Sequence, residues 1–294
     1  MKISGFSYVR NGFEYGYPFL EAIQSILPVC DEFVVAVGES TDGTREAIKD
    51  LGPKIKIIDT IWDMSKREGG KVFAQQANIA LDHITGDWAF HIQADEVMHE
   101  MDLPKIVAAI NENDSNPKVE AFILPFLHFW GSYKYVRTSR RMHYHEVRIF
   151  RNDKVIRSYA DSQGFRKYST VEAYEKGEKG QKLTVKKIDA GVYHYNGVRP
   201  YKVQKKKLHT FEFLHNSTLK EEDYDQFNYQ NVDRVVRFTG DHPAIMKEKI
   251  EHQDWEFTFD PKKAIWKPKD KWIQPIEDFL GFKIGEYKNY KLIR

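Results

Sequence analysis

Residues 86–96 read GDWAFHIQADE, an apolar run that ends abruptly in the adjacent carboxylates of Asp95 and Glu96. The run predicts a buried strand, whose polar end would lie at the carboxyl edge of a sheet, where α/β proteins bind ligands. Mg²⁺ and Mn²⁺ prefer carboxylate oxygens and are often shared between acidic side chains and substrate phosphates. The pair therefore indicates a metal-diphosphate site, although a strand followed by an acidic turn is also typical of an ordinary solvated loop.

A second strand with a polar turn lies upstream. Residues 32–37, EFVVAV, are rich in β-branched side chains, and the turn GESTDGT at 38–44 separates them from a helical pattern that begins at Arg45. Strand, turn and helix in this order predict a ligand-facing unit. Asp42 in the turn can instead cap the helix, because a short oxygen side chain accepts hydrogen bonds from the first free N–H groups.

Strand and helix patterns alternate over the first half of the chain. This alternation predicts an α/β fold with a mostly parallel central sheet and helices on both faces. The expected strands are 2–8, 32–37, 54–58, 88–92 and 121–126, and the expected helices are 19–27, 45–51, 72–84 and 103–110. Gly86 is expected to end the third helix.

The composition is that of a globular enzyme. The 294 residues are 41% hydrophobic, and 45 Lys and Arg stand against 43 Asp and Glu. This balance argues against a nucleic-acid partner, which needs many cations for the phosphates. The single cysteine fits a reducing compartment. The chain has no apolar stretch of membrane-spanning length and starts with a strand pattern rather than a signal peptide, so we expect a cytoplasmic protein, with at most peripheral contact at the inner face of the membrane.

Several of these segments, taken in order, resemble glycosyltransferase family 2, whose fold is called GT-A. They are the opening residues 3–11, the turn 40–44, the helix that carries Asn78, and the residues 86–88 and 93–96. The resemblance implies a GT-A-type catalytic domain over 1–200, with a donor half at about 1–100 and an acceptor half at about 101–200. It thins after residue 101, and a helical and irregular C-terminal extension over 201–294 is expected to pack on that domain.

The resemblance implies an inverting, metal-dependent transferase of the hexosyl type. It would move a sugar from a nucleotide-diphospho-sugar donor to a hydroxyl of a glycan or a lipid-linked acceptor, with Mn²⁺ or Mg²⁺. The metal would be held by Asp95 and Glu96, and by His194 in the late segment 193–199, which resembles the His-Tyr-Gly segment of many GT-A enzymes. A half-buried histidine between two tyrosines is the alternative for His194.

The chain departs from the family pattern at two places. The family usually has Asp where this chain has Gln93, whose amide can hydrogen-bond a sugar hydroxyl but binds cations poorly. The family also has an acidic residue at the end of the second strand, where Glu39 can substitute. The other donor-binding candidates are Asp42, Asn78 and Arg199, the last through a forked contact with a diphosphate oxygen, unless it is simply exposed.

Two carboxylates are candidates for the catalytic base. Asp161 lies in a polar loop beside aromatic residues, and Glu146 precedes an apolar strand. Either could take the acceptor proton. The alternative for Asp161 is a turn residue that bonds nearby backbone, and the alternative for Glu146 is a strand residue that faces solvent or pairs with Arg148. Aromatic residues of this region could bind an acceptor sugar or belong to the core; they are Trp130, Tyr133, Phe165 and Tyr168.

Three features of the sequence allow more than one interpretation. A basic amphipathic helix from Lys202 could lie on an anionic membrane or cover the catalytic domain. His143 and His145 would share a strand face, but without further ligands at suitable spacing they do not indicate zinc. A nucleotidyltransferase, or a noncatalytic nucleotide- or carbohydrate-binding protein of the same fold, is the alternative function.

Overall fold

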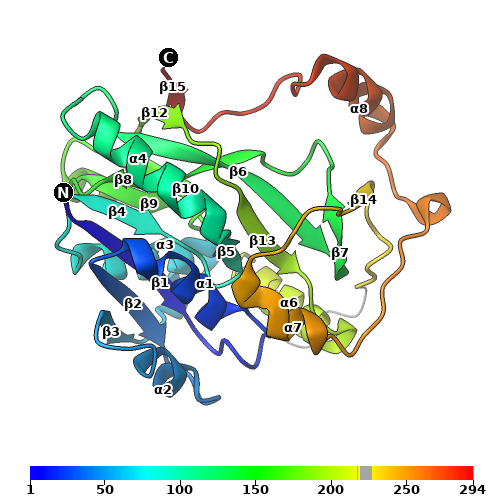
Figure 1. Ribbon diagram of the computed structural model, residues 1–294, viewed down its shortest axis with the longest axis horizontal. Coiled ribbons are helices and arrows are strands. Elements are labelled where there is room, and N and C mark those ends of the chain that lie inside the picture. The colour runs from blue at the N-terminus through cyan, green and yellow to red at the C-terminus, as the bar shows by residue number, and fades with distance from the viewer. Residues whose placement is uncertain (217, 219–226, 294) are drawn as a thin grey trace.

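A large twisted sheet forms the centre of the computed structural model (Figure 1). The structure describes residues 1–216, 218 and 227–293. Within them the main sheet follows the order β14-β7-β6-β8-β4-β1-β2-β3 and also takes in β5, β12, β13 and β15. The predicted α/β fold with a mostly parallel central sheet is confirmed.

The first half of the sheet is parallel and places the carboxyl ends of its strands at one edge. β1 pairs with β2 and β4, and β2 pairs with β3, all in parallel. These strands are Ile3–Val9 (β1), Glu32–Gly38 (β2), Ile55–Thr60 (β3) and Trp88–His91 (β4). Each lies within two residues of the range that the sequence predicts.

Helices cover both faces of this half. Phe33 and Val35 of β2 pack with buried residues of α1 and α4, whereas the alternating Val34 and Ala36 pack with α3. Successive side chains of a strand point to opposite faces, so both faces are apolar. The helices are Phe19–Ile26 (α1), Thr44–Lys49 (α2), Lys71–Asp82 (α3) and Leu103–Asn113 (α4). Gly86 does not end α3, which stops at Asp82. Gly86 has a different role: it lies so close to Ser4 of β1 that any side chain there would collide with it.

The second half of the fold mixes strand directions. β8 joins β4 to β6 in antiparallel pairs, while β12 and β13 run parallel to β6. Its elements are Glu96–Met98 (β5), Ala121–Trp130 (β6), Ser132–Arg137 (β7), His145–Arg151 (β8), Val171–Glu175 (α5), Thr184–Lys187 (β12) and Val192–Gly197 (β13).

The segment 157–170, read from sequence as irregular, is largely a small antiparallel sheet. It consists of Ile156–Tyr159 (β9), Gly164–Lys167 (β10) and Gln181–Lys182 (β11). The strands are too short to show alternation, and only packing of Phe165 and Ile156 against the α3 face of the main sheet defines them.

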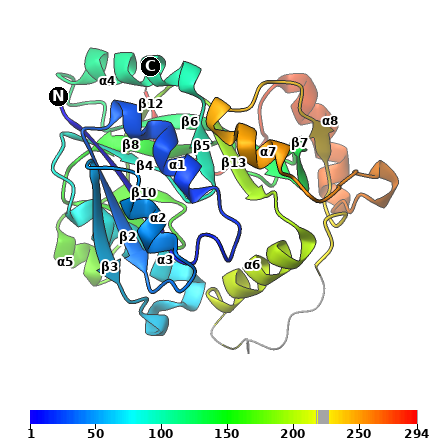
Figure 2. The ribbon, with the colours of Figure 1, turned by 60° about the horizontal axis from the view of Figure 1, so that its bottom comes forward.

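The residues after 200 wrap the second half of the sheet. They form Tyr201–Phe213 (α6), Val235–Arg237 (β14), Lys247–Glu251 (α7), Pro268–Leu280 (α8) and Lys291–Leu292 (β15). β14 pairs with β7 and β15 pairs with β12, so this part also contributes to the main sheet. Figure 2 shows α6 and α8 on the side away from β3. None of the helices in the described ranges is long and apolar enough to cross a bilayer.

Candidate active site

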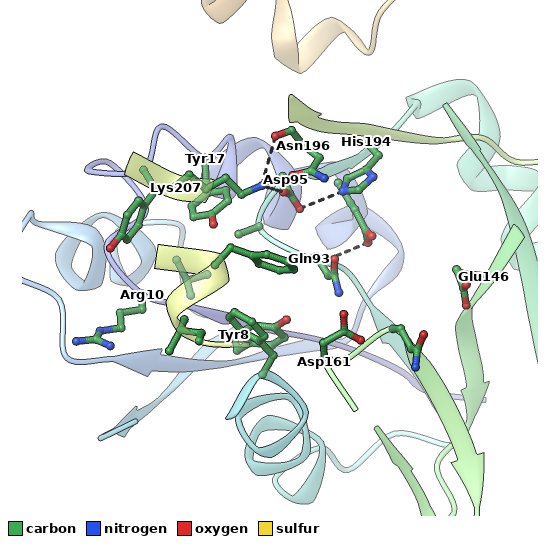
Figure 3. Close-up of a pocket in the computed structure, with 18 of the residues that line it drawn as sticks. Tyr8, Arg10, Tyr17, Gln93, Asp95, Glu146, Asp161, His194, Asn196 and Lys207 are labelled. Carbon is green, nitrogen blue, oxygen red and sulfur yellow. Dashed lines mark hydrogen bonds and ion pairs between the residues drawn. The ribbon is translucent and has the colours of Figure 1, made fainter. Parts of the chain in front are cut away.

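A pocket of about 470 Å³ opens at the carboxyl edge of β1 and β4. Figure 3 shows its main residues, which come from β1 and the loop after it, from the turn after β4, from the loop before β10, and from β13 and α6. Because these segments are distant in sequence, the tertiary fold alone brings them together. The pocket contains six of the ten site residues that the sequence predicts, namely Gln93, Asp95, Glu96, Glu146, Asp161 and His194.

Asp95 is nearly buried in this pocket and is surrounded by cations. Its Oδ2 accepts a hydrogen bond from Lys207 Nζ at 3.1 Å and lies 3.8 Å from Arg199 Nη2, while its Oδ1 lies 3.5 Å from His194 Nε2. Burial alone would raise the pKa of Asp95, but Lys207, His194 and Arg199 together hold it well below its usual range. The carboxylate is therefore ionised, and its two oxygens face different groups.

A chain of hydrogen bonds sets the tautomer of neutral His194. His128 Nε2 lies 2.8 Å from the backbone carbonyl of His143, so it must donate, and Nδ1 of a neutral His128 must accept. That Nδ1 lies 2.9 Å from His194 Nδ1, which then donates. In neutral His194 the remaining nitrogen, Nε2, consequently carries no proton, and its lone pair faces Asp95 Oδ1. Two lone pairs at 3.5 Å call for a positive charge between them, either a proton or a metal ion.

These atoms fit a divalent cation. Asp95 Oδ1 and His194 Nε2 are a carboxylate oxygen and an imidazole nitrogen, and the bond from His194 to His128 is the kind of support that orients a ligating histidine. Mg²⁺ and Mn²⁺ sites often take one or two protein ligands and complete the shell with substrate phosphates and water. Three imidazoles, His128, His143 and His194, also lie with one nitrogen each inside 4.8 Å, but both nitrogens of His128 are already hydrogen-bonded.

Glu96 is engaged elsewhere. Its two oxygens bind the Arg148 guanidinium at 2.6 and 2.9 Å, and Oε2 also accepts from the Gln93 N–H. Both partners of this ion pair are almost wholly buried. Breaking a buried pair leaves an uncompensated charge, so Glu96 is held in the turn rather than offered to a metal. The expectation of Glu96 as a metal ligand does not match this geometry.

The donor-binding candidates lie in different places. Gln93 lines the pocket and donates to the Ser162 carbonyl. Three others do not line it: Glu39 is exposed, Asp42 accepts from the Thr44 N–H and hydroxyl as a cap, and Asn78 bonds both backbone groups of Ser158. The capping alternative for Asp42 thus describes its contacts. Because Asn78 is fully used in fixing β9 to α3, it cannot reach a ligand in this arrangement.

Arg199 is 1% exposed and lies behind Asp95 rather than in the pocket. It donates to the Tyr15 carbonyl at 2.6 Å and to Gln204 Oε1 at 3.0 Å. Its guanidinium also stacks over the ring of Tyr17. Neither the exposed arginine nor the direct diphosphate contact considered from sequence corresponds to this position. Arg199 adds positive potential to Asp95 and fixes the first loop.

The two candidate bases lie on the side of the pocket away from Lys207 (Figure 3). Asp161 is one-third exposed, and its Oδ2 lies 3.5 Å from His215 Nε2. Its neighbours Ala160 and Ser162 both have positive φ, a strained conformation that is frequent at functional sites. Gly70 permits this loop to approach α3, since a side chain there would collide with Asp161 and His215.

Glu146 is the more deeply buried of the two carboxyls. Its Oε2 has no hydrogen-bond partner among the described residues, and burial raises the pKa of Glu146 to about 8, against the opposing effect of Arg148. At neutral pH Glu146 is therefore largely protonated, whereas Asp161 sits beside a histidine. Burial opposes protonation of His215, but the nearby carboxylate of Asp161 and the hydrogen bond to the Phe211 carbonyl raise its pKa overall.

Sequence reasoning missed Lys207 and the aromatic lining. Lys207 is spaced with Phe211 and Leu214 at helical positions i, i+4 and i+7, but a lysine in a basic run is ordinarily solvated, so this spacing alone does not indicate burial. It is buried and also bonds the Asn196 side chain. Tyr8, Trp62, Phe73 and Phe211 form a contiguous aromatic wall. The predicted acceptor-side aromatics lie outside the pocket, and Phe165, Tyr133 and Tyr168 are buried in the structure.

The sequence matches a model of the family described as Glycosyl transferase family 2 over residues 18–172, more than half of the chain. The chain belongs to glycosyltransferase family 2. The family and the GT-A fold expected from the sequence are thereby confirmed, and so is the general class of activity, a glycosyltransferase. No curated protein matches the sequence significantly.

Solved structures of glycosyltransferase type are distantly similar. TarS 1-349 of S. aureus matches with a TM-score of 0.39 and 16% identity, over 75% of this chain and 67% of that one. A longer TarS chain is covered over 41% of its length. Glucosyl-3-phosphoglycerate synthase from Mycobacterium tuberculosis, in complex with Mn²⁺, uridine-diphosphate-glucose and phosphoglyceric acid, matches with a TM-score of 0.29 and 17% identity, over 44% of each chain.

Proposed function

We propose that the protein transfers a sugar, with inversion, from a nucleotide-diphospho-sugar to a hydroxyl of a glycan or lipid-linked acceptor. The observation that carries this proposal is the polarity of the pocket. Lys207 and His194 meet Asp95 on one side, and the carboxyls of Asp161 and Glu146 lie on the other (Figure 3). A displacement at a sugar carbon needs this arrangement, with positive charge at the leaving group and a base opposite.

The aromatic wall supports an aromatic or sugar ligand. Tyr8 and Phe73 lie with ring centroids 6.2 Å apart, and Phe73 in turn contacts Trp62 and Phe211. Flat apolar faces of this kind suit a nucleobase or the face of a sugar ring. Gln93, beside Asp95, offers an amide for a hydroxyl.

Asp95 and His194 would hold Mn²⁺ or Mg²⁺, and when bound the cation would act as a Lewis acid on the diphosphate. Lys207 supplies a further positive charge from the protein. Its Nζ, hydrogen-bonded to Asp95 and Asn196, is positioned to offset charge that develops on the leaving diphosphate. A lysine acts here as a compact point charge.

The remaining chemistry is one displacement. The bond between the anomeric carbon and the phosphate oxygen breaks, the bond between that carbon and the acceptor oxygen forms, and the acceptor proton passes to a carboxylate. We assign this base to Asp161, because a base must be ionised before the step and the raised pKa of Glu146 keeps its carboxyl largely protonated at neutral pH. Glu146 then remains the second candidate.

Donor turnover tests the proposal. The wild-type chain is incubated with a panel of nucleotide sugars and acceptors, with and without Mn²⁺, and Asp95→Asn is compared with it. We expect metal-stimulated transfer by the wild type and its loss in Asp95→Asn, with melting temperatures checking that both proteins are folded. Donor binding without any turnover by the wild type would instead favour a noncatalytic binding protein. Full activity of Asp95→Asn would rule out the metal site.

A further inference from the structure

Helix α8 is oriented opposite to an ordinary surface helix. Its buried residues are polar: Asp270, Gln274 and Glu277, at positions i, i+4 and i+7. Arg140 donates to Asp270 at 3.0 Å and to Glu277 at 3.0 Å, and its backbone N–H donates to Gln274. Arg141 adds a bond of 2.7 Å to Asp270. A surface helix normally buries its apolar stripe, so the inward face of α8 is fixed by ion pairs instead.

The apolar stripe of α8 faces solvent. Trp272, Ile276 and Phe279, again at i, i+4 and i+7, are 78%, 50% and 90% exposed. Phe282 and Ile284 extend this surface beyond the end of the helix. Contiguous exposed aromatic and aliphatic side chains on one helix face mark a binding surface. We call the residues Trp272, Ile276, Phe279 and Phe282 the outer face.

The acidic and basic side chains of α8 also lie on different parts of the helix: its acids are paired with arginines, and its lysines are exposed. Asp270 and Glu277 are taken by Arg140, and Asp278 by Arg234 at 2.5 Å. By contrast, the first turn presents exposed lysines. These are Lys267, Lys269 and Lys271, with Lys262 and Lys263 shortly before. The outer face therefore combines aromatic side chains with unneutralised positive charge.

We propose that the outer face of α8 binds the surface of an anionic lipid bilayer. A helix with tryptophan and phenylalanine on one face and lysines beside them lies in the headgroup region, where the rings enter the acyl boundary and the ammonium groups meet lipid phosphates. The charge of the lysines complements anionic lipid. Nothing comparable links them to a second copy of this face, which would bring like charges together.

The position of α8 relative to the pocket suggests what a membrane contact would do for catalysis. This step rests on the proposed function. Tyr287, seven residues after the helix, lines the pocket, and so does Arg141, which bonds Asp270 of the helix. A chain docked through α8 would hold the pocket close to the membrane surface. An acceptor hydroxyl on a lipid-linked molecule would then be within reach.

Co-sedimentation of the full chain with vesicles tests the contact without any turnover. Phosphatidylcholine vesicles are compared with vesicles in which part of this lipid is replaced by phosphatidylglycerol. We expect binding to the anionic vesicles only. The double variant Trp272→Gln with Phe279→Gln should bind them about tenfold more weakly or worse. Replacing Lys267, Lys269 and Lys271 by Gln should weaken binding by on the order of a hundredfold, since each lysine near an anionic surface contributes about fivefold.

Met101→Gln provides the matched control, because Met101 is 73% exposed and lies outside the outer face. It should bind like the wild type. Since the substituted side chains are exposed, far-ultraviolet circular dichroism should show every variant folded. Absence of wild-type binding, or full binding by the double variant, would overturn the proposal. So would a concentration-dependent dimer that the double variant abolishes, because the outer face would then belong to a subunit interface. If the proposed function were wrong, the turnover assay would fail while vesicle binding stayed as expected, so the two failures can be told apart.

Discussion

Helices α6 and α8 come from similar stretches of sequence and are used in opposite ways. Both mix lysines with aromatic residues, and the sequence points to the first as a candidate for membrane contact. In the structure α6 turns Lys207 inward to Asp95, and its Phe211 and Leu214 line the pocket. α8 turns its acids inward to Arg140 and its aromatic residues outward.

The partner of the buried charge decides which face of each helix points inward. Lys207 faces an ionised carboxylate, and the acids of α8 face arginines. In each case a buried charge is acceptable only because an opposite charge meets it. On α6 the apolar residues share the inward side with the lysine, whereas on α8 the acids occupy that side and leave the apolar residues outside.

The largest effect is expected at the inward cation of α6. Lys207→Met should lower kcat/KM by on the order of a thousandfold, because the leaving diphosphate loses a preorganised positive charge and Asp95 loses its direct partner. Steady-state kinetics with saturating Mn²⁺ measures this. Lys202→Met, at an exposed position of the same helix, is the control and should be nearly silent. Vesicle binding should not change in Lys207→Met; its loss would mean that the two helices are not functionally separate.

A smaller effect is expected on the side of the pocket opposite Lys207. Asp161→Asn should reduce kcat about a hundredfold while donor binding is retained, on the scale of general-base catalysis. Isothermal titration with the donor separates the two quantities. Glu146→Gln should keep most of its kcat. If Glu146→Gln is inactive, and the wild-type rate rises with an apparent pKa of about 8, the base is Glu146 instead.

The anchor of α8 should contribute to stability rather than to chemistry. Arg140→Met removes the arginine partner of Glu277 and leaves Asp270 paired with Arg141 alone, and we expect the free energy of unfolding to fall by about 2 kcal/mol. Urea titration measures this loss. Arg237→Met, at an exposed arginine of β14, should change the free energy by less than about 0.5 kcal/mol. Equal losses in both variants would show that the α8 ion pairs do not fix the helix.

The smallest effect on activity is expected from the carboxyl of Glu146, which acts on the pH dependence of stability instead. Its folded-state pKa of about 8 is raised above the unfolded value, so its protonated form favours folding at low pH, and this contribution is lost as pH rises through 8. Glu146→Gln cannot ionise. The melting temperature of Glu146→Gln should therefore rise relative to that of the wild type by roughly 6 °C between pH 5 and pH 9. A constant difference across this range would contradict the raised pKa.

The motif residues could be predicted because they depend on local sequence. Asp95 follows a strand whose apolar pattern is unambiguous, and His194 belongs to a short segment, 193–199, that resembles a family motif. The cap at Asp42 was also readable. Lys207 and Arg199 were not, because a lysine in a basic run and an arginine after a strand are ordinarily solvated. Only the approach of α6 to the β4 turn, more than a hundred residues away in sequence, makes them partners of Asp95.

The sequence by itself determined the family, the order of strands and helices in the first half, and the carboxylate at the end of β4, since periodicity and short motifs encode these directly. The tertiary structure decided which charges meet. It assigned Glu96 to Arg148, Asn78 to β9, and Lys207 to the pocket, and it turned the aromatic stripe of α8 outward. The physical reason is that ion pairing and burial depend on distances between segments far apart in the chain, which no local pattern specifies.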